Sequence, residues 1–450
     1  MRSSPSLLSR LLADYGMVLV LALLCAFFSI ATQSEQHPTG AEAGHALSSD
    51  LLGRYPKGAR ILVAVPDQPE SVAFAEALAT DLTRGGAQVR RVTGDPKAAR
   101  AALQEATKDG PLDAIACDHT SASWMVFSDV PTDFPTLGRP RIEQPAAYRW
   151  PNFLKRDNLL NIANQIAVIA IVAIGMTLVI ITGGIDLSVG SLIALAAVLA
   201  TLGIRDVAGA QQASPWGMTA SCLVAILATG LAGGVTGSLI TVFRLPPFIV
   251  TLAMMLVASG GAYLLTHGQS VYQVPDTFVW LGRGTGPFGL PIAVLLMVLL
   301  YGVAHFVMSG TVLGRHLYAV GGNRVASRYS GVPVRRVILT AYVVSGLLSG
   351  LGGVVLASQL KSGSPTFGNM YELYVIAAVV VGGASLNGGT GRMFGTLVGA
   401  FVIAVIQNGM NLMNVESYTQ KVVLGLVILG AVLLDLLRER GWKLDLSGGE

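Results

Sequence analysis

Long apolar runs separated by short polar stretches dominate the pattern of this chain of 450 residues. The runs cover residues 15–31, 162–181, 191–202, 218–242, 248–265, 291–308, 337–357, 373–381, 394–412 and 422–437. A helix needs about 20 apolar residues to cross a bilayer, so the short run at 373–381 is expected to be a partial or broken helix. The pattern predicts an all-α polytopic membrane protein with about ten transmembrane helices, some of them broken.

The composition agrees with a membrane protein, because 52% of the residues are hydrophobic and only 12% are charged. Soluble domains carry about 25% charged residues. The segment 311–336 holds five arginines and no acid, which places it in the cytoplasm under the positive-inside rule. Alternate threading then puts both termini in the cytoplasm, including a tail at 438–450. The net charge of +4 is attributed to this topology and not to nucleic-acid binding.

The first run has two interpretations. Residues 1–34 form a first transmembrane helix, or a signal peptide is cleaved after the small-x-small site Ser29-Ile30-Ala31. The run is long for a signal core, which favours the membrane anchor. Both interpretations place the insert that follows, residues 35–150, outside the cytoplasm.

Hydrophobicity falls sharply over this insert. Strands are expected at 60–66, 88–92 and 112–117, with 123–127 as a fourth candidate, and helices at 70–84 and 96–110. This alternation predicts a small extracytoplasmic α/β unit with a parallel sheet at about 58–118, followed by a proline-rich linker. Pro66 and Asp67 follow the first strand in place of a glycine-rich turn, so no dinucleotide site is indicated. A structural or docking role and direct ligand binding both stay open.

The membrane part, 151–437, is interrupted by a glycine-rich stretch between its first two runs. The stretch contains Gly183, Gly184 and Gly190, one carboxylate, Asp186, and one hydroxyl, Ser188. Glycines break or bend helices, and freed backbone groups are tolerated at membrane depth only inside protein or beside a watery cavity. Asp186 or Ser188 caps the next helix, or they belong to a pathway or gating element; both interpretations can hold together.

A second interruption, at 381–391, repeats the Gly-Gly pattern with Ser385 in the place of the aspartate and Asn387 beyond it. Two interrupted segments in corresponding parts of a chain point to a transport pathway.

Two further patterns concern contacts between helices. Amides at Gln407, Asn408 and Asn411 hydrogen-bond neighbouring helices, or they line a hydrated path for a polar solute. Small residues at helix-contact spacing predict close packing; they are Gly230, Gly233, Gly234 and Gly237 in one run, and Gly346, Gly350 and Gly353 in another.

Several kinds of chemistry are not indicated. Cys25, Cys117 and Cys222 have no close spacing, so neither a disulfide framework nor a metal site is expected. The chain contains no G-x-x-x-x-G-K-[ST], so it does not bind ATP through that motif. We expect no cofactor and no enzymatic activity.

Three motifs resemble the sugar-permease family of bacterial ABC importers, in its ribose, xylose, arabinose and galactose branch. They are GGIDLSVG at 183–190, YAVGGNRVASRYSGV at 318–332 and GGASLNGGTG at 382–391. The resemblance covers about 152–437. It implies an inner-membrane permease that moves a monosaccharide such as ribose, or a similar polyol. Its implied partners are a second permease as homodimer or heterodimer, a cytoplasmic ATP-binding-cassette ATPase, an extracytoplasmic sugar-binding protein and membrane lipid.

Two features depart from the family. A typical member joins its first two helices by a short loop, and it carries Glu or Pro-Glu where this chain has Arg324 and Val325.

The resemblance implies that the loop around 324–329 contacts the ATPase. The segment is expected to form one or two helical turns between glycines, with Arg324 and Arg328 on one face. The alternative is that these arginines only fix topology and bind lipid headgroups. The predicted coupling residues are Gly321, Gly322, Asn323, Arg324, Ala326, Arg328 and Gly331.

Two other functions compete with an importer subunit. A secondary carrier or channel for a small polar solute would work without an ATPase, but an ion-coupled carrier should show more intramembrane carboxylates than Asp186 alone. A sensor or scaffold would need an intracellular output domain, which the short predicted tail does not supply.

Overall fold

The computed structural model describes residues 7–439, which fall into two compact units. One unit contains the chain up to Thr32 and from Asn152 onward, and the other contains Gln33–Pro151. Each unit is described by itself. Most of the predicted tail, 440–450, lies outside the described residues.

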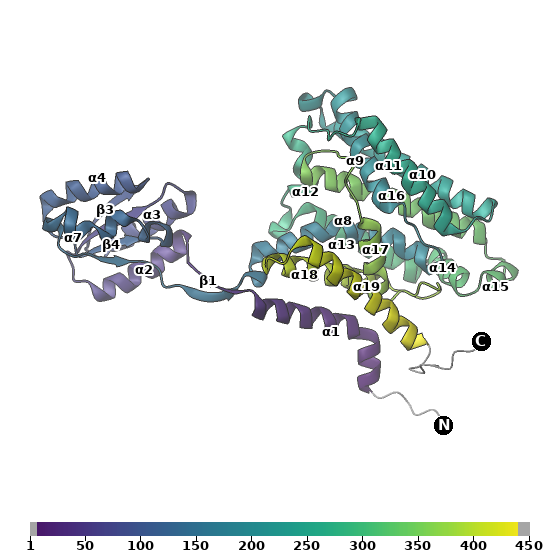
Figure 1. The fold of residues 1–450 in the computed structure, drawn as a ribbon, viewed down its shortest axis with the longest axis horizontal. Helices are drawn as coiled ribbons and strands as arrows, with labels where there is room; N and C mark the ends of the chain where they lie inside the picture. Colours follow the sequence, from purple (N-terminus) through teal and green to yellow (C-terminus); the bar gives the residue numbers. More distant parts are fainter. Residues whose placement is uncertain (1–6, 440–450) are drawn as a thin grey trace. The chain divides into compact units, whose positions relative to one another are not determined.

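The first unit is helical (Figure 1). Its main apolar helices are α1 (Leu7–Ala31), α8 (Arg156–Ile181), α9 (Val189–Leu202), α10 (Pro215–Val242), α11 (Pro247–Thr266), α13 (Ile292–Gly310), α16 (Val334–Leu360), α17 (Tyr371–Val381), α18 (Met393–Leu412) and α19 (Ser417–Glu439). Short helices are α12 (Trp280–Arg283), α14 (Val312–Gly322) and α15 (Arg324–Tyr329), with further turns at Asn152–Leu154, Gly203–Val207, Ala210–Gln212, Asp276–Val279 and Pro287–Gly289.

Every apolar run predicted from the sequence is helical in this unit. Within the described residues, 7 helices are long and apolar enough to cross a membrane, and three apolar helices are shorter, at Gly16–Ala31, Tyr371–Val381 and Ser417–Gly430. A helical, multi-pass membrane protein is therefore confirmed. The number of crossings stays a prediction.

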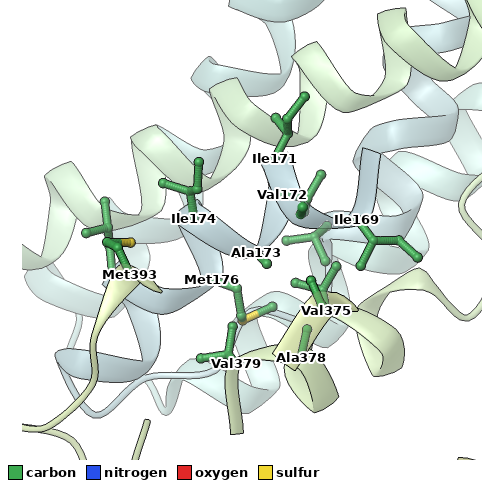
Figure 2. Close-up of a cluster of buried hydrophobic side chains, with 14 of the residues drawn as sticks. Ile169, Ile171, Val172, Ala173, Ile174, Met176, Val375, Ala378, Val379 and Met393 are labelled. Carbon is green, nitrogen blue, oxygen red and sulfur yellow. The ribbon is translucent and has the colours of Figure 1, made fainter. Parts of the chain in front are cut away.

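Helix α8 forms the centre of the bundle. It is apolar on all sides and buried without interruption from Ile166 to Ile181, as expected of a helix surrounded by other helices. Figure 2 shows Ala173 and Met176 of α8 among Val375 and Val379 of α17, with Met393 at the start of α18 nearby.

The glycine stripes serve close helix packing, as predicted. Helix α10 packs along α16 (Figure 1). A Cβ atom on Gly233 would lie 2.2 Å from the carbonyl oxygen of Tyr342, and one on Gly346 would lie 2.3 Å from that of Thr229. Only glycine permits this approach of the two backbones.

The second unit is the predicted α/β fold with a parallel sheet. The strands β2 (Arg60–Val65), β3 (Gln88–Thr93), β4 (Ala114–Cys117) and β5 (Arg141–Glu143) lie in the order β3-β2-β4-β5, all parallel. The helices are α2 (Gly40–Arg54), α3 (Pro69–Arg84), α4 (Pro96–Ala106), α5 (His119–Ala122), α6 (Met125–Ser128) and α7 (Val130–Asp133), with 3-10 turns at Thr107–Asp109 and Pro135–Leu137. Strands β1 (Gln33–Gln36) and β6 (Tyr148–Pro151) pair antiparallel.

The fourth strand was predicted in the wrong place. Residues 123–127 contribute to helix α6, because Val126 and Phe127 are adjacent and both buried in one cluster, whereas neighbours on a strand face opposite sides. The fourth strand is β5, inside the stretch predicted to be a linker. The α/β fold therefore extends beyond 58–118 in both directions, from α2 to β5.

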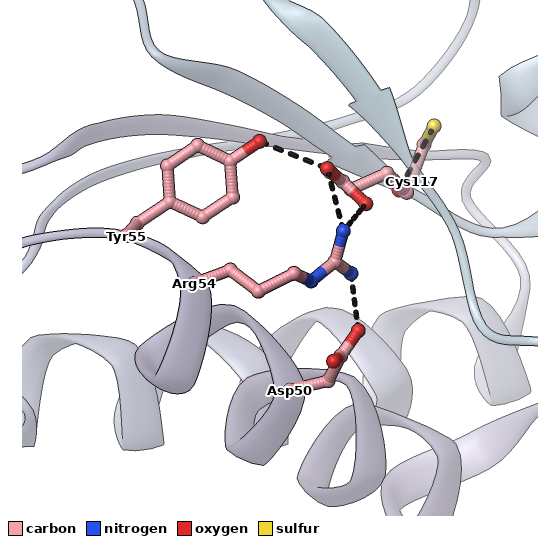
Figure 3. Close-up of polar contacts among 5 residues, drawn as sticks. Asp50, Arg54, Tyr55 and Cys117 are labelled. Carbon is pink, nitrogen blue, oxygen red and sulfur yellow. Dashed lines mark hydrogen bonds and ion pairs between the residues drawn. The ribbon is translucent and has the colours of Figure 1, made fainter.

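A polar cluster ties β5 to the end of α2 (Figure 3). The Glu143 carboxylate accepts a hydrogen bond from the Tyr55 hydroxyl at 2.8 Å and forms an ion pair with Arg54 at 3.0 Å, and Arg54 also binds Asp50. The Sγ of Cys117 lies 3.7 Å from the Glu143 backbone oxygen. Burial and the hydrogen bond to Glu143 raise the pKa of Tyr55 to about 12.

The carboxylate at the end of β4 is also occupied by structural contacts. Asp118 accepts from the Ser71 hydroxyl at 2.6 Å and from the Ser121 backbone N–H at 2.8 Å, which caps α5. Because protein groups already bind both of its oxygens, the Asp118 carboxylate is not available to a ligand.

Candidate functional site

The first predicted interruption separates α8 from α9. Gly183 adopts φ +72°, and its N–H donates to Ile180 O at 2.8 Å, while the Gly184 N–H donates to Val179 O at 3.1 Å. This pair of bonds is the Schellman motif, which ends a helix with a left-handed residue. Glycine is favoured there because other residues resist a positive φ.

Asp186 braces the connection between α8 and α9 against α16. Its side chain is 1% exposed. One oxygen accepts from the Ser188 N–H at 3.0 Å and hydroxyl at 2.6 Å, and the other accepts from the Ser345 hydroxyl at 2.8 Å. These bonds satisfy a buried carboxylate. They do not cap the first-turn N–H groups of α9, and Ser188, at the cap position, makes no side-chain cap bond either.

The second interruption, between α17 and α18, repeats this geometry. Gly383 adopts φ +89°, and its N–H donates to Val380 O at 2.9 Å, while the Ala384 N–H donates to Val379 O at 3.1 Å. Ser385 Oγ accepts from the Asn387 N–H at 3.3 Å, as Asp186 does from Ser188. Both stretches therefore end the preceding helix in the same way, although the left-handed residue is the first glycine of the pair in one stretch, Gly183, and the second in the other, Gly383.

The two interruptions meet the end of α14. The Gly389 N–H donates to Ile181 O at 2.8 Å. A Cβ on Gly321 would lie 1.7 Å from Ile181 O and 2.4 Å from Gly389 N, and a Cβ on Gly388 would lie 2.9 Å from Gly183 N. Three backbones approach where only glycine fits. We call this place, residues 181–184, 321–324 and 388–389, the glycine junction.

Arg324 connects the glycine junction to helix α15. Its Nη2 donates to the carbonyl oxygens of Thr182 at 2.8 Å and Gly183 at 3.3 Å. A guanidinium at these carbonyls satisfies groups that the end of α8 leaves open, and its charge complements the helix dipole. Arg324 and Arg328 are both exposed, and the Arg324 side chain also reaches these two carbonyl oxygens.

Helix α15 has the bounds predicted for it. Asn323 Oδ1 accepts from the N–H groups of Val325 and Ala326 at 3.0 and 2.9 Å, which caps the first turn. At the other end Gly331 adopts φ +83° and its N–H donates to Arg328 O at 3.1 Å.

The outer side of α15 is exposed and partly apolar. Val325 is 66% exposed and Tyr329 is 89% exposed. An exposed apolar pair four residues apart on one helix face is typical of a surface that contacts another protein.

The predicted amides lie away from the glycine junction and bond to other helices. Asn408 exchanges two hydrogen bonds with Asn158 of α8, at 2.9 and 3.1 Å, and Asn411 Oδ1 accepts from Gln420 of α19 at 2.8 Å. Gln407 is partly buried on the same helix. The contacts of Asn408 and Asn411 are those of the helix-bonding alternative.

Three residues of this region were not predicted. Ser345 holds Asp186, and the Tyr342 hydroxyl donates to Ile185 O at 3.3 Å. Glu372 lies against Gly190, where a Cβ would be 2.3 Å from its Oε2. Ser345 could have been suspected as a hydroxyl beside the glycine stripe. Glu372 directly precedes the run at 373–381, and for that reason the sequence alone did not place it within the membrane part.

A large cavity of about 1030 Å³ borders the second interruption. It is lined by residues of α1, α13 and α14 and by the stretch 382–398, including Tyr318, whose hydroxyl donates to Gly391 O at 2.8 Å. Among the residues that the structure describes, no group of His, Cys, Asp and Glu side chains is arranged to hold a metal ion.

A bundle of apolar helices with two matching interruptions, joined to a surface helix, defines a polytopic membrane transport protein. Residues 158–432 match the family described as the permease component of the branched-chain amino acid transport system, and the chain belongs to this family. The match lies within the helical unit and does not include the insert.

Curated relatives agree with this family. The chain is 45% identical over 293 residues to the ribose import permease protein RbsC of Escherichia coli K12, covering 63% of this chain and 87% of the relative. It is 43% identical over 293 residues to RbsC of Bacillus subtilis 168, covering 63% and 86%. It is 34% identical over 286 residues to the D-allose transport system permease protein AlsC of E. coli K12, covering 63% and 85%. No solved structure matches.

The resemblance to importer permeases that was based on three sequence motifs is therefore confirmed. The motifs at 183–190 and 382–391 contribute backbone contacts to the glycine junction, and the motif at 318–332 contributes Gly321 and Arg324.

Proposed function

We propose that this chain is the translocation subunit of an ATP-driven importer for a monosaccharide, with ribose as the first candidate. A sugar substrate is supported by the relatives named as ribose and D-allose permeases, because this chain matches them over most of their length. ATP is hydrolysed by a separate cytoplasmic ATPase, and a separate binding protein delivers the sugar outside. The permease acts as a dimer with a second permease in the inner membrane, in contact with lipid.

The single observation that supports this proposal best is the glycine junction. An ATPase that docks on the exposed face of α15, at Val325 and Tyr329, moves a segment whose Arg324 binds the carbonyl oxygens at the end of α8. Gly321, in backbone contact with both interruptions, moves with it. Movement of α15 is therefore transmitted to the two broken helices without passing through a flexible linker. Arg328 and Gly331 belong to the docking surface and its hinge.

The broken helices line or gate the pathway in this proposal. Gly183 and Gly184 supply the bend, and Asp186 with Ser188 holds the connection to α16. Asn387 has the corresponding position in the second interruption. The amide side chains at 407–411 hold α18 in a fixed position against its neighbouring helices while the broken helices move.

The topology belongs to the same proposal. Ten helices cross the membrane, both termini and the loop 311–336 are cytoplasmic, and the α/β insert is extracytoplasmic. The concentration of arginine in 311–336 supports this orientation. The insert serves as a structural or docking module, because its buried carboxylates Asp118 and Glu143 are already bound by protein groups.

Reconstitution tests the proposal. Liposomes that contain this chain, its ATPase and its binding protein should accumulate radiolabelled ribose only when ATP is present on the ATPase side. An ATPase unable to hydrolyse ATP should abolish accumulation. Uptake that persists without the ATPase and follows an imposed ion gradient would instead establish a secondary carrier and contradict the proposal.

A further inference from the structure

A second, smaller cavity in the helical unit lies beside the start of α9. Its volume is about 290 Å³, near the lower end of the range of roughly 300–1000 Å³ for small-molecule sites. Helices α9, α11 and α17 and the segment 365–369 enclose it. That segment continues into α17, so three helices and one irregular stretch converge on the same space.

Six polar side chains line this cavity, and one of them, Thr366, already shares a hydrogen bond of 2.9 Å with the Ser364 hydroxyl. The other five are Ser191, Ser259, Tyr263, Asn369 and Glu372. Within the described part of the chain, none of the five makes a side-chain hydrogen bond to another residue.

Other hydroxyls on the same helices behave differently. Thr201 of α9 donates to Ala197 O, and Thr266 of α11 donates to Ala262 O, both at 2.8 Å. Serine and threonine in helices commonly bond back to their own backbone in this way. Ser191 and Ser259 do not, so their hydroxyls stay available to a molecule in the cavity.

Glu372 is held at the wall of the cavity by a glycine. A Cβ on Gly190 would lie 2.3 Å from Glu372 Oε2 and 2.5 Å from Gly368 O, so the carboxylate packs directly on the backbone of α9. This position is in the first turn of α9, where the helix dipole favours a negative charge. The side chain is half-buried and belongs to none of the ion pairs among the described residues.

The lining also indicates which solutes fit. It contains one carboxylate and no lysine or arginine, so an anionic solute would be repelled. The other polar groups are hydroxyls and an amide, which bind hydroxyl groups in either direction. Phe367, Met255 and the Tyr263 ring supply apolar and aromatic surface for the carbon face of a sugar.

We propose that this cavity is a transit site for a neutral, polyhydroxylated solute, in which Glu372 accepts hydrogen bonds from solute hydroxyls. The inference rests on the proposed function and adds to it the place and the chemistry of solute contact. Gly190, which was expected in a pathway, then serves to admit the Glu372 carboxylate to the cavity wall.

The test uses the reconstituted transporter with its ATPase and binding protein, and radiolabelled ribose as the probe. Glu372→Gln keeps the size of the side chain and removes its charge. Charge-assisted hydrogen bonds are about twice as strong as neutral ones, so ribose uptake should fall about tenfold. Complex yield should stay within about twofold of wild type, because the substitution keeps the size of a half-buried side chain.

A matched pair on α11 tests the cavity itself. Ser259→Phe places a ring in the cavity and should abolish uptake. Val257→Phe places the same ring on the same helix at a side chain that is 68% exposed, and it should retain uptake.

The outcomes separate the two proposals. A wild-type complex that takes up no ribose with ATP contradicts the proposed function. An active wild type in which Glu372→Gln is unimpaired, or in which Ser259→Phe and Val257→Phe behave alike, overturns the transit site.

Discussion

Ser345→Ala is the sharpest perturbation that the junction region offers. The Ser345 hydroxyl donates a hydrogen bond to the Asp186 carboxylate at 2.8 Å. Among the described residues, this is the one side-chain hydrogen bond through which Asp186 joins the α8–α9 connection to α16. Both side chains are buried, at 0% and 1% exposed. A hydrogen bond to a charged group contributes about 1.5–3 kcal/mol. Loss of this bond should make local opening of the α8–α9 connection away from α16 easier by about 2 kcal/mol. This corresponds to roughly a 30-fold increase in the equilibrium constant for opening.

Hydrogen–deuterium exchange of the membrane-reconstituted protein measures this release. The backbone amides of 184–190 should exchange about 30-fold faster in Ser345→Ala, because local opening sets their exchange rate. Ribose uptake should fall while complex yield stays near wild type.

Ser349→Ala is the matched control. Ser349 lies one turn further along α16, is equally buried, and donates only to Ser345 O of its own helix at 2.8 Å. Its removal should leave exchange at 184–190 unchanged. Equal exchange in the two variants, or no acceleration in Ser345→Ala, would refute the bracing role of this bond.

Three further predictions concern packing and the insert. Gly321→Ala should abolish uptake and reduce complex yield, because its Cβ would lie 1.7 Å from Ile181 O, whereas Gly322→Ala, with nothing within 4 Å, should be tolerated in the same assays. Glu143→Ala should destabilise the insert by roughly 2 kcal/mol, less than breaking a fully buried pair because Arg54 is 44% exposed, and pulse proteolysis of the full chain should show it. Tyr55 has its pKa raised to about 12 from about 10 in the unfolded chain, so the unfolded state loses its proton first. The insert should therefore lose stability as the pH rises from about 10 to about 12, and Tyr55→Phe should remove this part of the pH dependence.

The sequence predicted the elements of the fold better than their contacts. Apolar length alone was enough to locate every long helix of the first unit, because a buried or lipid-facing helix needs that length. Both ends of helix α15 were predicted at the correct residues, because an asparagine caps its start and a glycine follows its end. Residues 123–127 were misassigned because a short apolar run has the same appearance in a strand and in a helical turn.

The glycine junction was only half predictable. Its glycines were identified, and two interruptions were paired by their similar sequences. Their meeting point was not, because the Gly389 N–H to Ile181 O bond and the Arg324 bonds to carbonyl oxygens use backbone groups that every residue carries. Such contacts have no side-chain signature. Glu372 was missed for a different reason, since its placement against Gly190 depends on the irregular segment before α17.

Coupling through Arg324 is the central claim, and the ratio of ribose imported to ATP hydrolysed tests it most directly. In the reconstituted transporter, Arg324→Gln should lower this ratio at least tenfold while the ATPase still binds and hydrolyses ATP, because the bonds to Thr182 and Gly183 carry the movement. Arg336→Gln, an exposed arginine of the same loop, should leave the ratio unchanged. A wild-type ratio in Arg324→Gln would contradict the account.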